Sequence, residues 1–396
     1  MSEPAIPTQP PDFSLVLGGP LYQLFRRAHL TGDALQLLRR RILVLAGVAW
    51  IPLLLLSAFA GQAWGGTIAV PFLQDIEAHV RFLVALPILV AAEIVVHLRL
   101  RPTVAQFVAR RIVTEEDMPR FQEAIDSTRR VRNSVIAEIT LLVLVYTVGL
   151  WVWKSQIALG TASWYATPEA GHTNLTPAGY WYALVSVPIF QFILVRWYFR
   201  FFLWFSFLWR VSRLNLRLVP IHPDRAAGLS FLGRGSYAFA PILFAQGALL
   251  SALIASQIFY AGRNLLAFKV EIVSFVAFFV AIVLSPLIVF SPKLARAKRQ
   301  GLADFGLLAS RYVGAFEDKW VREGASTGEP LLGSADIQSL ADLGNSYSVV
   351  QEMRLVPFGL KDVTRLAAGA AVPLLPLTLT IFSLEELVTR LLAVLL

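Results

Sequence analysis

The sequence predicts an all-α polytopic membrane protein with about seven transmembrane helices and with helical extensions on the cytoplasmic side. Of its 396 residues, 56% are hydrophobic and only 15% are charged, and the mean hydropathy is +0.63. This balance lies outside that of soluble globular proteins. Apolar runs long enough to cross about 30 Å of hydrocarbon as helices recur along the chain. None alternates with the period of two that outer-membrane strands require.

The seven predicted spans are residues 41–60, 80–98, 137–153, 179–198, 237–258, 272–290 and 367–383. The third and the last are short, so their ends are the least well defined. The first is too long for the apolar segment of a secretory signal peptide, and 40 residues precede it. We therefore expect the first span to be retained as a membrane helix.

Lys and Arg residues are distributed unevenly between the segments that separate the spans. Of the 35 in the chain, 29 lie in residues 1–41, 99–135, 199–236 and 291–366, and 4 lie in the alternate segments. Because short basic loops stay in the cytoplasm, we expect a cytoplasmic N-terminus and an external C-terminus in a cell membrane, as in the inner membrane of a bacterium. The net charge of +9 arises from these segments. Basic residues next to membrane spans attract anionic lipids, so the charge indicates membrane lipids rather than nucleic acid as the partner.

This pattern divides the chain into four parts: a cytoplasmic tail and amphipathic helix (1–40), a six-helix transmembrane core with cytoplasmic loops 99–135 and 199–236 (41–290), a cytoplasmic helical stalk (291–366), and a seventh transmembrane helix with an external C-terminal tail (367–396). Apolar residues recur at helical spacing in two stretches of the stalk. These apolar faces need a partner: each other, a neighbouring subunit of a homo-oligomer, or a soluble protein.

A group of ionisable residues is predicted in the cytoplasmic half of the membrane. Glu93 and His97 lie one helical turn apart in the second span, Glu138 opens the third, and Arg196 and Arg200 share one face of the fourth. Charges inside a membrane are costly, and they mark either a pathway or a structural pair. We expect Glu93 to pair with Arg196 and Glu138 to lie nearby, whether as a lock between helices or as the lining of an ion path.

Two further polar residues lie near the middle of their spans. Gln191 belongs to the fourth span and Gln246 to the fifth. An amide side chain at this depth either coordinates an ion or bonds to a neighbouring helix.

The stretch between the fourth and fifth spans reads IHPDRAAGLSFLGRGS and contains His222, Asp224, Gly228 and Gly233. Two potential ligands with no third nearby do not make a metal site. We expect a turn in which Asp224 caps a helix that begins at Arg225. Its functional interpretation is a hinge or gate at a cytoplasmic mouth.

No catalytic or cofactor-binding motif is present, and the absence of cysteine excludes thiolate metal sites. We therefore expect no enzyme activity and no cofactor. The favoured function is transport, by an oligomeric ion channel or a small-ion permease in which the stalk serves assembly or gating. The alternative is a signalling or scaffold component that recruits a soluble partner through residues 291–366. A third interpretation, a lipid-modifying enzyme, would use His222 and Asp224 at the inner interface.

Overall fold

The computed structural model describes residues 13–20, 22–23, 38–65, 68, 70–152, 163–169, 172–322 and 335–380. Within these residues, seven helices are long and apolar enough to cross a membrane. The predicted all-α polytopic fold is thereby confirmed, and the protein is an integral, multi-pass membrane protein. The C-terminal tail beyond residue 380 and residues 24–37 of the predicted amphipathic helix lie outside the described residues.

The first four spans and the helix between the second and third are, in chain order, α2 (Leu38–Phe59); α3, η3 and α4 (Ile76–His79, Val80–Ala85, Leu86–Ala109); α5 (Met118–Arg132); α6 and η4 (Val135–Leu144, Val145–Gly149); and α8, η5 and α9 (Pro177–Trp181, Tyr182–Ser186, Val187–Ser212). The remaining elements are α10, η6 and α11 (Phe231–Gly235, Ser236–Phe239, Ala240–Ala261); η7, α12, η8, α13 and η9 (Leu265–Phe268, Lys269–Leu284, Ser285–Phe290, Ser291–Glu317, Asp318–Arg322); α14 (Ala335–Gln351); and α15 and η10 (Leu360–Ala371, Val372–Thr380).

Two of the spans contain a π-helical turn just before a proline. The turn η3 precedes Pro87 and the turn η5 precedes Pro188. Proline has no N–H to donate, so the carbonyl one turn earlier lacks its α-helical partner and the helix adjusts locally. Each π turn thus rotates the side chains before it relative to those after it.

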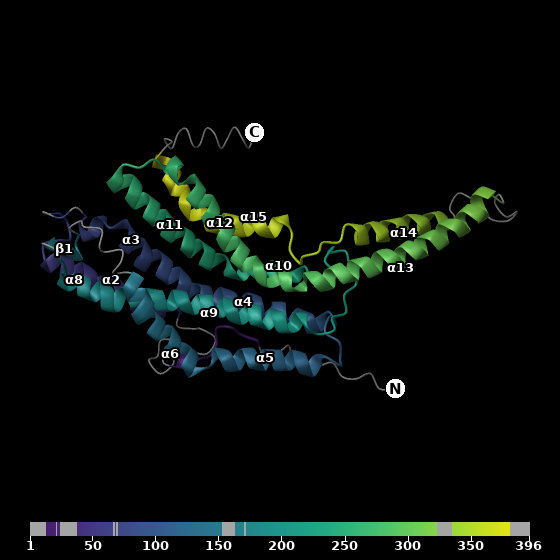
Figure 1. The fold of residues 1–396 in the computed structure, drawn as a ribbon, viewed down its shortest axis with the longest axis horizontal. Coiled ribbons are helices and arrows are strands. Elements are labelled where there is room, and N and C mark those ends of the chain that lie inside the picture. Colours follow the sequence, from purple (N-terminus) through teal and green to yellow (C-terminus); the bar gives the residue numbers. More distant parts are fainter. Residues whose placement is uncertain are drawn as a thin grey trace.

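The helices form an elongated bundle (Figure 1). The second span (α3–α4) lies between α2, the fourth span (α8–α9) and α11, and α11 is covered in turn by α15 and η10. The helix α5 packs along α9. The buried core runs the length of this bundle and is rich in aromatic side chains, including Trp197, Trp204 and Phe207.

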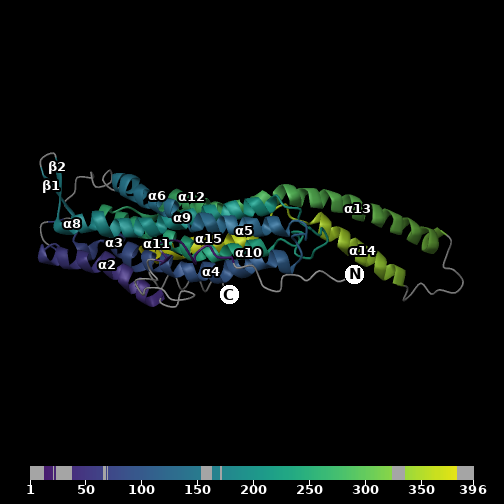
Figure 2. The same cartoon turned by 90° about the horizontal axis from the view of Figure 1, so that it is seen from below.

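A helical hairpin of α13 and α14 projects from one end of the bundle (Figures 1 and 2). The helix that begins in the sixth span continues into α13 and ends with η9 at Arg322, so η9 also belongs to the hairpin. Near its tip, Asp336 accepts hydrogen bonds from Lys319 (2.8 Å) and Trp320 (3.0 Å). These two donors hold the pKa of Asp336 below its usual value. The end of the spans from which α5, the 213–230 loop and this hairpin extend is named the basic end.

A short β-hairpin lies at the opposite end of the bundle, between the third and fourth spans. Its strands, β1 (Ala166–Glu169) and β2 (His172–Leu175), are antiparallel, with Ala166 opposite Leu175. The sequence analysis expected no strand here. Thr176 follows β2 directly and caps α8 through the N–H of Gly179, so the hairpin leads straight into the fourth span.

Candidate functional site

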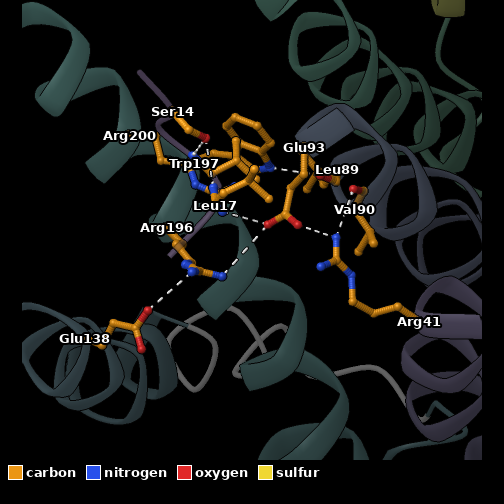
Figure 3. A network of polar contacts seen from close by, with 11 residues as sticks. Ser14, Leu17, Arg41, Leu89, Val90, Glu93, Glu138, Arg196, Trp197 and Arg200 are labelled. Carbon is orange, nitrogen blue, oxygen red and sulfur yellow. Dashed lines mark hydrogen bonds and ion pairs between the residues drawn. The ribbon is translucent and has the colours of Figure 1, made fainter. Parts of the chain in front are cut away.

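Five ionised side chains from four spans meet near the basic end, as Figure 3 shows; we name them the charge cluster. Glu93 of α4 binds Arg41 of α2 and accepts a 2.7 Å hydrogen bond from Arg200 of α9. Arg196 lies 3.8 Å from Glu93 and 3.3 Å from Glu138 of α6. No side chain of the cluster is more than 12% exposed.

The structure thus brings together Glu93, Glu138, Arg196 and Arg200, as the sequence suggested, and it adds Arg41. Removing ions from water costs several kcal/mol each, which only well-formed pairs repay. Arg200 is fixed further by the ring of Trp197, 4.5 Å away, and the Trp197 indole donates to the carbonyl of Leu89. The ion pairs of Glu93 and Arg196 therefore connect helices α2, α4, α6 and α9.

Local sequence places Glu138 in this cluster. Ser134 is the N-cap of α6 and accepts a hydrogen bond from the N–H of Ala137. Glu138 therefore lies in the first turn of α6, where the helix dipole stabilises a negative charge. The carboxylate reaches Arg196 from this position.

Residues 13–20, named the N-terminal cap, cover the charge cluster from the basic end. Phe13 is buried against Trp204 and Phe207, and Leu15 and Val16 are only 1% exposed. The sequence predicts a cytoplasmic tail at these residues. The structure instead packs them into the core between α4, α5 and α9.

Polar contacts hold the N-terminal cap in place. The hydroxyl of Ser14 lies 3.1 Å from Nδ1 of His97, and Arg132 of α5 donates to the carbonyl of Ser14. His97 therefore contacts the N-terminal cap. Gly19 has φ +92°, and a Cβ there would come within 3.0 Å of the Glu138 carboxylate, so only glycine fits against the cluster at this point.

The two midspan glutamines lie apart from the charge cluster. Gln191 approaches the carbonyl of Gly149 at 3.4 Å, where α9 passes the π turn of the third span. Gln246 donates to the hydroxyl of Tyr198 at 2.8 Å. Both therefore bond across helices, which is one of the two roles expected from the sequence.

Gln246 also lines a cavity of about 270 Å³, which we name the midspan cavity. Its walls are Glu77, Arg81, Phe190, Gln246, Leu249, Leu250, Ala252, Leu253 and Phe275. Arg81 donates to the hydroxyl of Tyr182 and lies 3.8 Å from Glu77. Arg81 was not among the site residues predicted from the sequence. The sequence feature that could have identified Arg81 is its spacing from Glu77. Side chains four residues apart lie on one face of a helix and can pair.

The turn that contains His222 and Asp224 differs from its prediction. No helix begins at Arg225, and α10 starts only at Phe231. The Asp224 carboxylate instead accepts from the N–H groups of Ala226 (2.8 Å), Gly228 (3.1 Å) and Ser230 (3.1 Å). An aspartate that bonds to the N–H two residues on competes with helix formation, and Arg225 and Ala227 accordingly adopt positive φ.

These hydrogen bonds set the charge state of Asp224. Partial burial alone would raise its pKa, but the three backbone donors hold the pKa of Asp224 below its usual value. Nδ1 of His222 lies 3.0 Å from the same carboxylate. The ionised Asp224 therefore organises the turn around itself.

The turn is also joined to the segment that precedes the seventh span. Arg354 donates to the carbonyls of Asp224 (2.9 Å) and Arg225 (2.7 Å), and Arg225 pairs with Glu352 at 2.9 Å. A Cβ at Gly233 would lie 2.9 Å from the carbonyl of Pro357. The packed contact between this turn and the segment before the seventh span thus contains His222, Asp224, Gly228 and Gly233. These residues do not belong to the charge cluster.

Within the described part of the chain, no three His, Asp or Glu side chains come close enough to hold a metal ion. Comparison of the chain with models of protein families, with curated proteins and with solved structures gives no match. The geometry of the charge cluster and of the midspan cavity is therefore what bears on function.

Proposed function

We propose that this membrane protein is a transport protein, a permease for small ions or small charged solutes. The midspan cavity is its binding chamber, and the charge cluster with the N-terminal cap is its closed gate at the basic end. It needs no cofactor and catalyses no reaction. Its surroundings are membrane lipids.

The observation that carries this proposal is the composition of the charge cluster. Three arginines and two glutamates from four spans are almost fully buried. Ionisable groups inside a membrane are expensive and usually belong to a pathway for ions or protons.

The second span favours a permease over a permanently open channel. Glu93 follows Arg81 by 12 residues, a rise of about 18 Å along a helix. The side chains of Phe82, Leu86 and Leu89 between them are fully buried. This apolar layer separates the midspan cavity from the charge cluster, so transport requires the helices to move. An ion channel would need its path between the subunits of a homo-oligomer.

Flux into liposomes tests the proposal. We expect the purified protein to carry K⁺, Cl⁻, H⁺ or a small zwitterionic solute faster than empty liposomes, and Glu138→Gln to change the rate about tenfold because it alters the charge of the gate. The exposed Glu271 on α12 provides the control Glu271→Gln, which should leave the rate unchanged. Absence of flux for all three ions would contradict ion transport, and equal effects of both variants would exclude the charge cluster as the gate.

We also propose that the basic end faces the cytoplasm, because 29 of the 35 Lys and Arg residues lie in segments on that side. The chain has no cysteine, so single cysteines can be labelled cleanly. Arg263→Cys should react with an impermeant maleimide added to intact cells, and Ser310→Cys only after permeabilisation. The opposite result would invert the orientation.

A second function is supported by the hairpin. Five of its large apolar side chains are at least 43% exposed: Leu307, Leu308, Val313, Val321 and Ile337. Such a surface on a projecting element suits a soluble partner or a second copy. A photo-crosslinking residue at Val321 distinguishes these: adducts with a soluble protein favour the scaffold, adducts with the protein itself favour the homo-oligomer, and no adduct contradicts both.

A further inference from the structure

The midspan cavity combines two opposite charges with apolar walls. Arg81 and Glu77 line it from the second span, and Gln246 lines it from α11. The rest of the lining is aliphatic or aromatic, from α9, α11 and α12. A few polar groups in a mainly apolar hollow are the usual composition of a site for a small molecule.

The two charged groups are placed to receive a ligand. Arg81 and Glu77 are 3.8 Å apart, which is longer than a hydrogen bond, and their side chains are 24% and 36% exposed. Arg81 is oriented by its hydrogen bond to Tyr182. Because a guanidinium has five N–H donors in a fixed plane, Arg81 can bind a carboxylate and keep this contact.

The backbone supplies an independent observation. Arg81 lies in the π turn η3, and its partner Tyr182 lies in the π turn η5 of the neighbouring span. Turns of this kind are rare, and they occur frequently at functional sites because they re-aim side chains. The hydrogen bond between Arg81 and Tyr182 joins two of them, and Arg81 lines the cavity.

We propose that the midspan cavity binds a free α-amino acid with an apolar side chain, such as leucine. The carboxylate pairs with Arg81, the ammonium group pairs with Glu77, and the side chain contacts Leu250 and Leu253. The inference rests on the proposed transport function in one respect: it names the class of solute that the binding chamber holds.

A zwitterion fits these charges better than a simple ion does. A lone anion near Arg81 would be repelled by Glu77, and a lone cation near Glu77 would be repelled by Arg81. The volume of about 270 Å³ is slightly below the common range for ligand pockets, roughly 300–1,000 Å³, and it therefore selects a small molecule.

A zwitterionic lipid headgroup shares this chemistry, so the experiment must separate the two sources. The purified protein is placed in nanodiscs made only of phosphatidylglycerol, and binding of L-leucine is measured by titration calorimetry. Isopentylamine and 4-methylpentanoate, which each lack one of the two charges, are titrated in parallel. A second set of nanodiscs contains phosphatidylethanolamine.

We expect L-leucine to bind at least tenfold more tightly than either single-charge analogue, and equally well in both kinds of nanodisc. Leu253→Trp, which fills the cavity from a half-exposed position, should weaken binding at least tenfold. Leu266→Trp, an exposed position outside the cavity, should leave binding unchanged. Arg81→Lys should weaken binding while retaining the charge.

Equal binding of all three probes, or no binding of leucine at millimolar concentration, would overturn the proposal. Loss of leucine binding in the presence of phosphatidylethanolamine would also overturn it and would assign the site to a lipid headgroup. Flux measurements separate this inference from the proposed function. Leucine binding without any flux would sustain the site and contradict transport, whereas ion flux without leucine binding would do the reverse.

Discussion

The second span carries two polar sites that differ in how far the protein encloses them. In the charge cluster, the side chains of Glu93 and Arg200 are 10% and 4% exposed. In the midspan cavity, the side chains of Glu77 and Arg81 are 36% and 24% exposed. The two sites use similar groups on one continuous helix, and only their enclosure differs.

This difference separates two uses of charge in a membrane. Enclosed charges must satisfy one another, so they fix the helices that carry them and cannot exchange partners without a conformational change. Partly open charges are not fully used by protein partners and can pair with another group. In this protein the enclosed site therefore suits a gate, and the open site suits a binding chamber.

The largest effect should follow from removing the central carboxylate. Glu93→Gln leaves three arginines around a neutral group, and breaking a buried ion pair in this way costs about 3–5 kcal/mol. Thermal unfolding in detergent measures the loss. The exposed control Glu271→Gln should unfold as the wild type does.

A double-mutant cycle sharpens this result. Combining Glu93→Gln with Arg200→Gln should recover more stability than combining it with Arg196→Gln, because Arg200 lies 2.7 Å from Glu93 and Arg196 lies 3.8 Å away. Additive losses in both cycles would show that these residues are not coupled and that the charge cluster does not hold the helices together.

The N-terminal cap provides the second test. Gly19→Ala should lose about 1–2 kcal/mol from its left-handed backbone and about 1–3 kcal/mol more from the collision with Glu138. Gly61 also has positive φ (+68°) but has no neighbour within 4 Å of an added Cβ, so Gly61→Ala should show the backbone cost alone. Equal losses in the two variants would mean that the cap does not press on the charge cluster.

A smaller loss is expected at the open site. Tyr182→Phe removes the hydroxyl that accepts from Arg81, and a hydrogen bond of this kind contributes about 1 kcal/mol net. Arg81 is partly exposed and can bind water instead. Unfolding in detergent should therefore show a loss well below that of Glu93→Gln; a similar loss would erase the contrast between the two sites.

The smallest effect depends on pH and concerns Asp224, outside the spans. Its folded pKa lies below its usual value, so its ionised form stabilises the fold above the unfolded pKa of about 3.9. This contribution disappears as the pH falls through the folded pKa. Asp224→Asn should therefore cost about 1 kcal/mol at pH 7 and nothing at the lowest pH that the fold tolerates. A difference that does not change with pH would contradict this role.

The sequence predicted the spans and most of the charge cluster because both follow from local pattern. Apolar length defines a span, and helical spacing places Glu93, Glu138 and Arg196 at similar depth. Arg41 was missed because three consecutive arginines begin α2, and residues 100° apart on a helix face different ways. Packing against α4, rather than local pattern, selects the one that turns inward.

The N-terminal cap and the 221–230 turn could not be predicted for related reasons. The cap is buried by helices α4, α5 and α9, which follow it by more than 60 residues, so the local sequence suggested a tail. In the turn, the sequence predicted that Asp224 caps a helix, but this side chain accepts from the N–H of Ala226 and no helix begins there. In both segments the local sequence allows the predicted and the observed conformation, and tertiary contacts select the observed one.

The length of the hairpin determines how far its tip projects from the bundle. Helices α13 and η9 contain 27 and 5 residues, so they reach about 48 Å at 1.5 Å per residue. Electrostatic potentials in physiological salt decay over about 8 Å. The hairpin is therefore several screening lengths long, so its tip can meet molecules beyond the field of the lipid headgroups. A soluble molecule can encounter the hairpin at a rate set by its own charges and by diffusion.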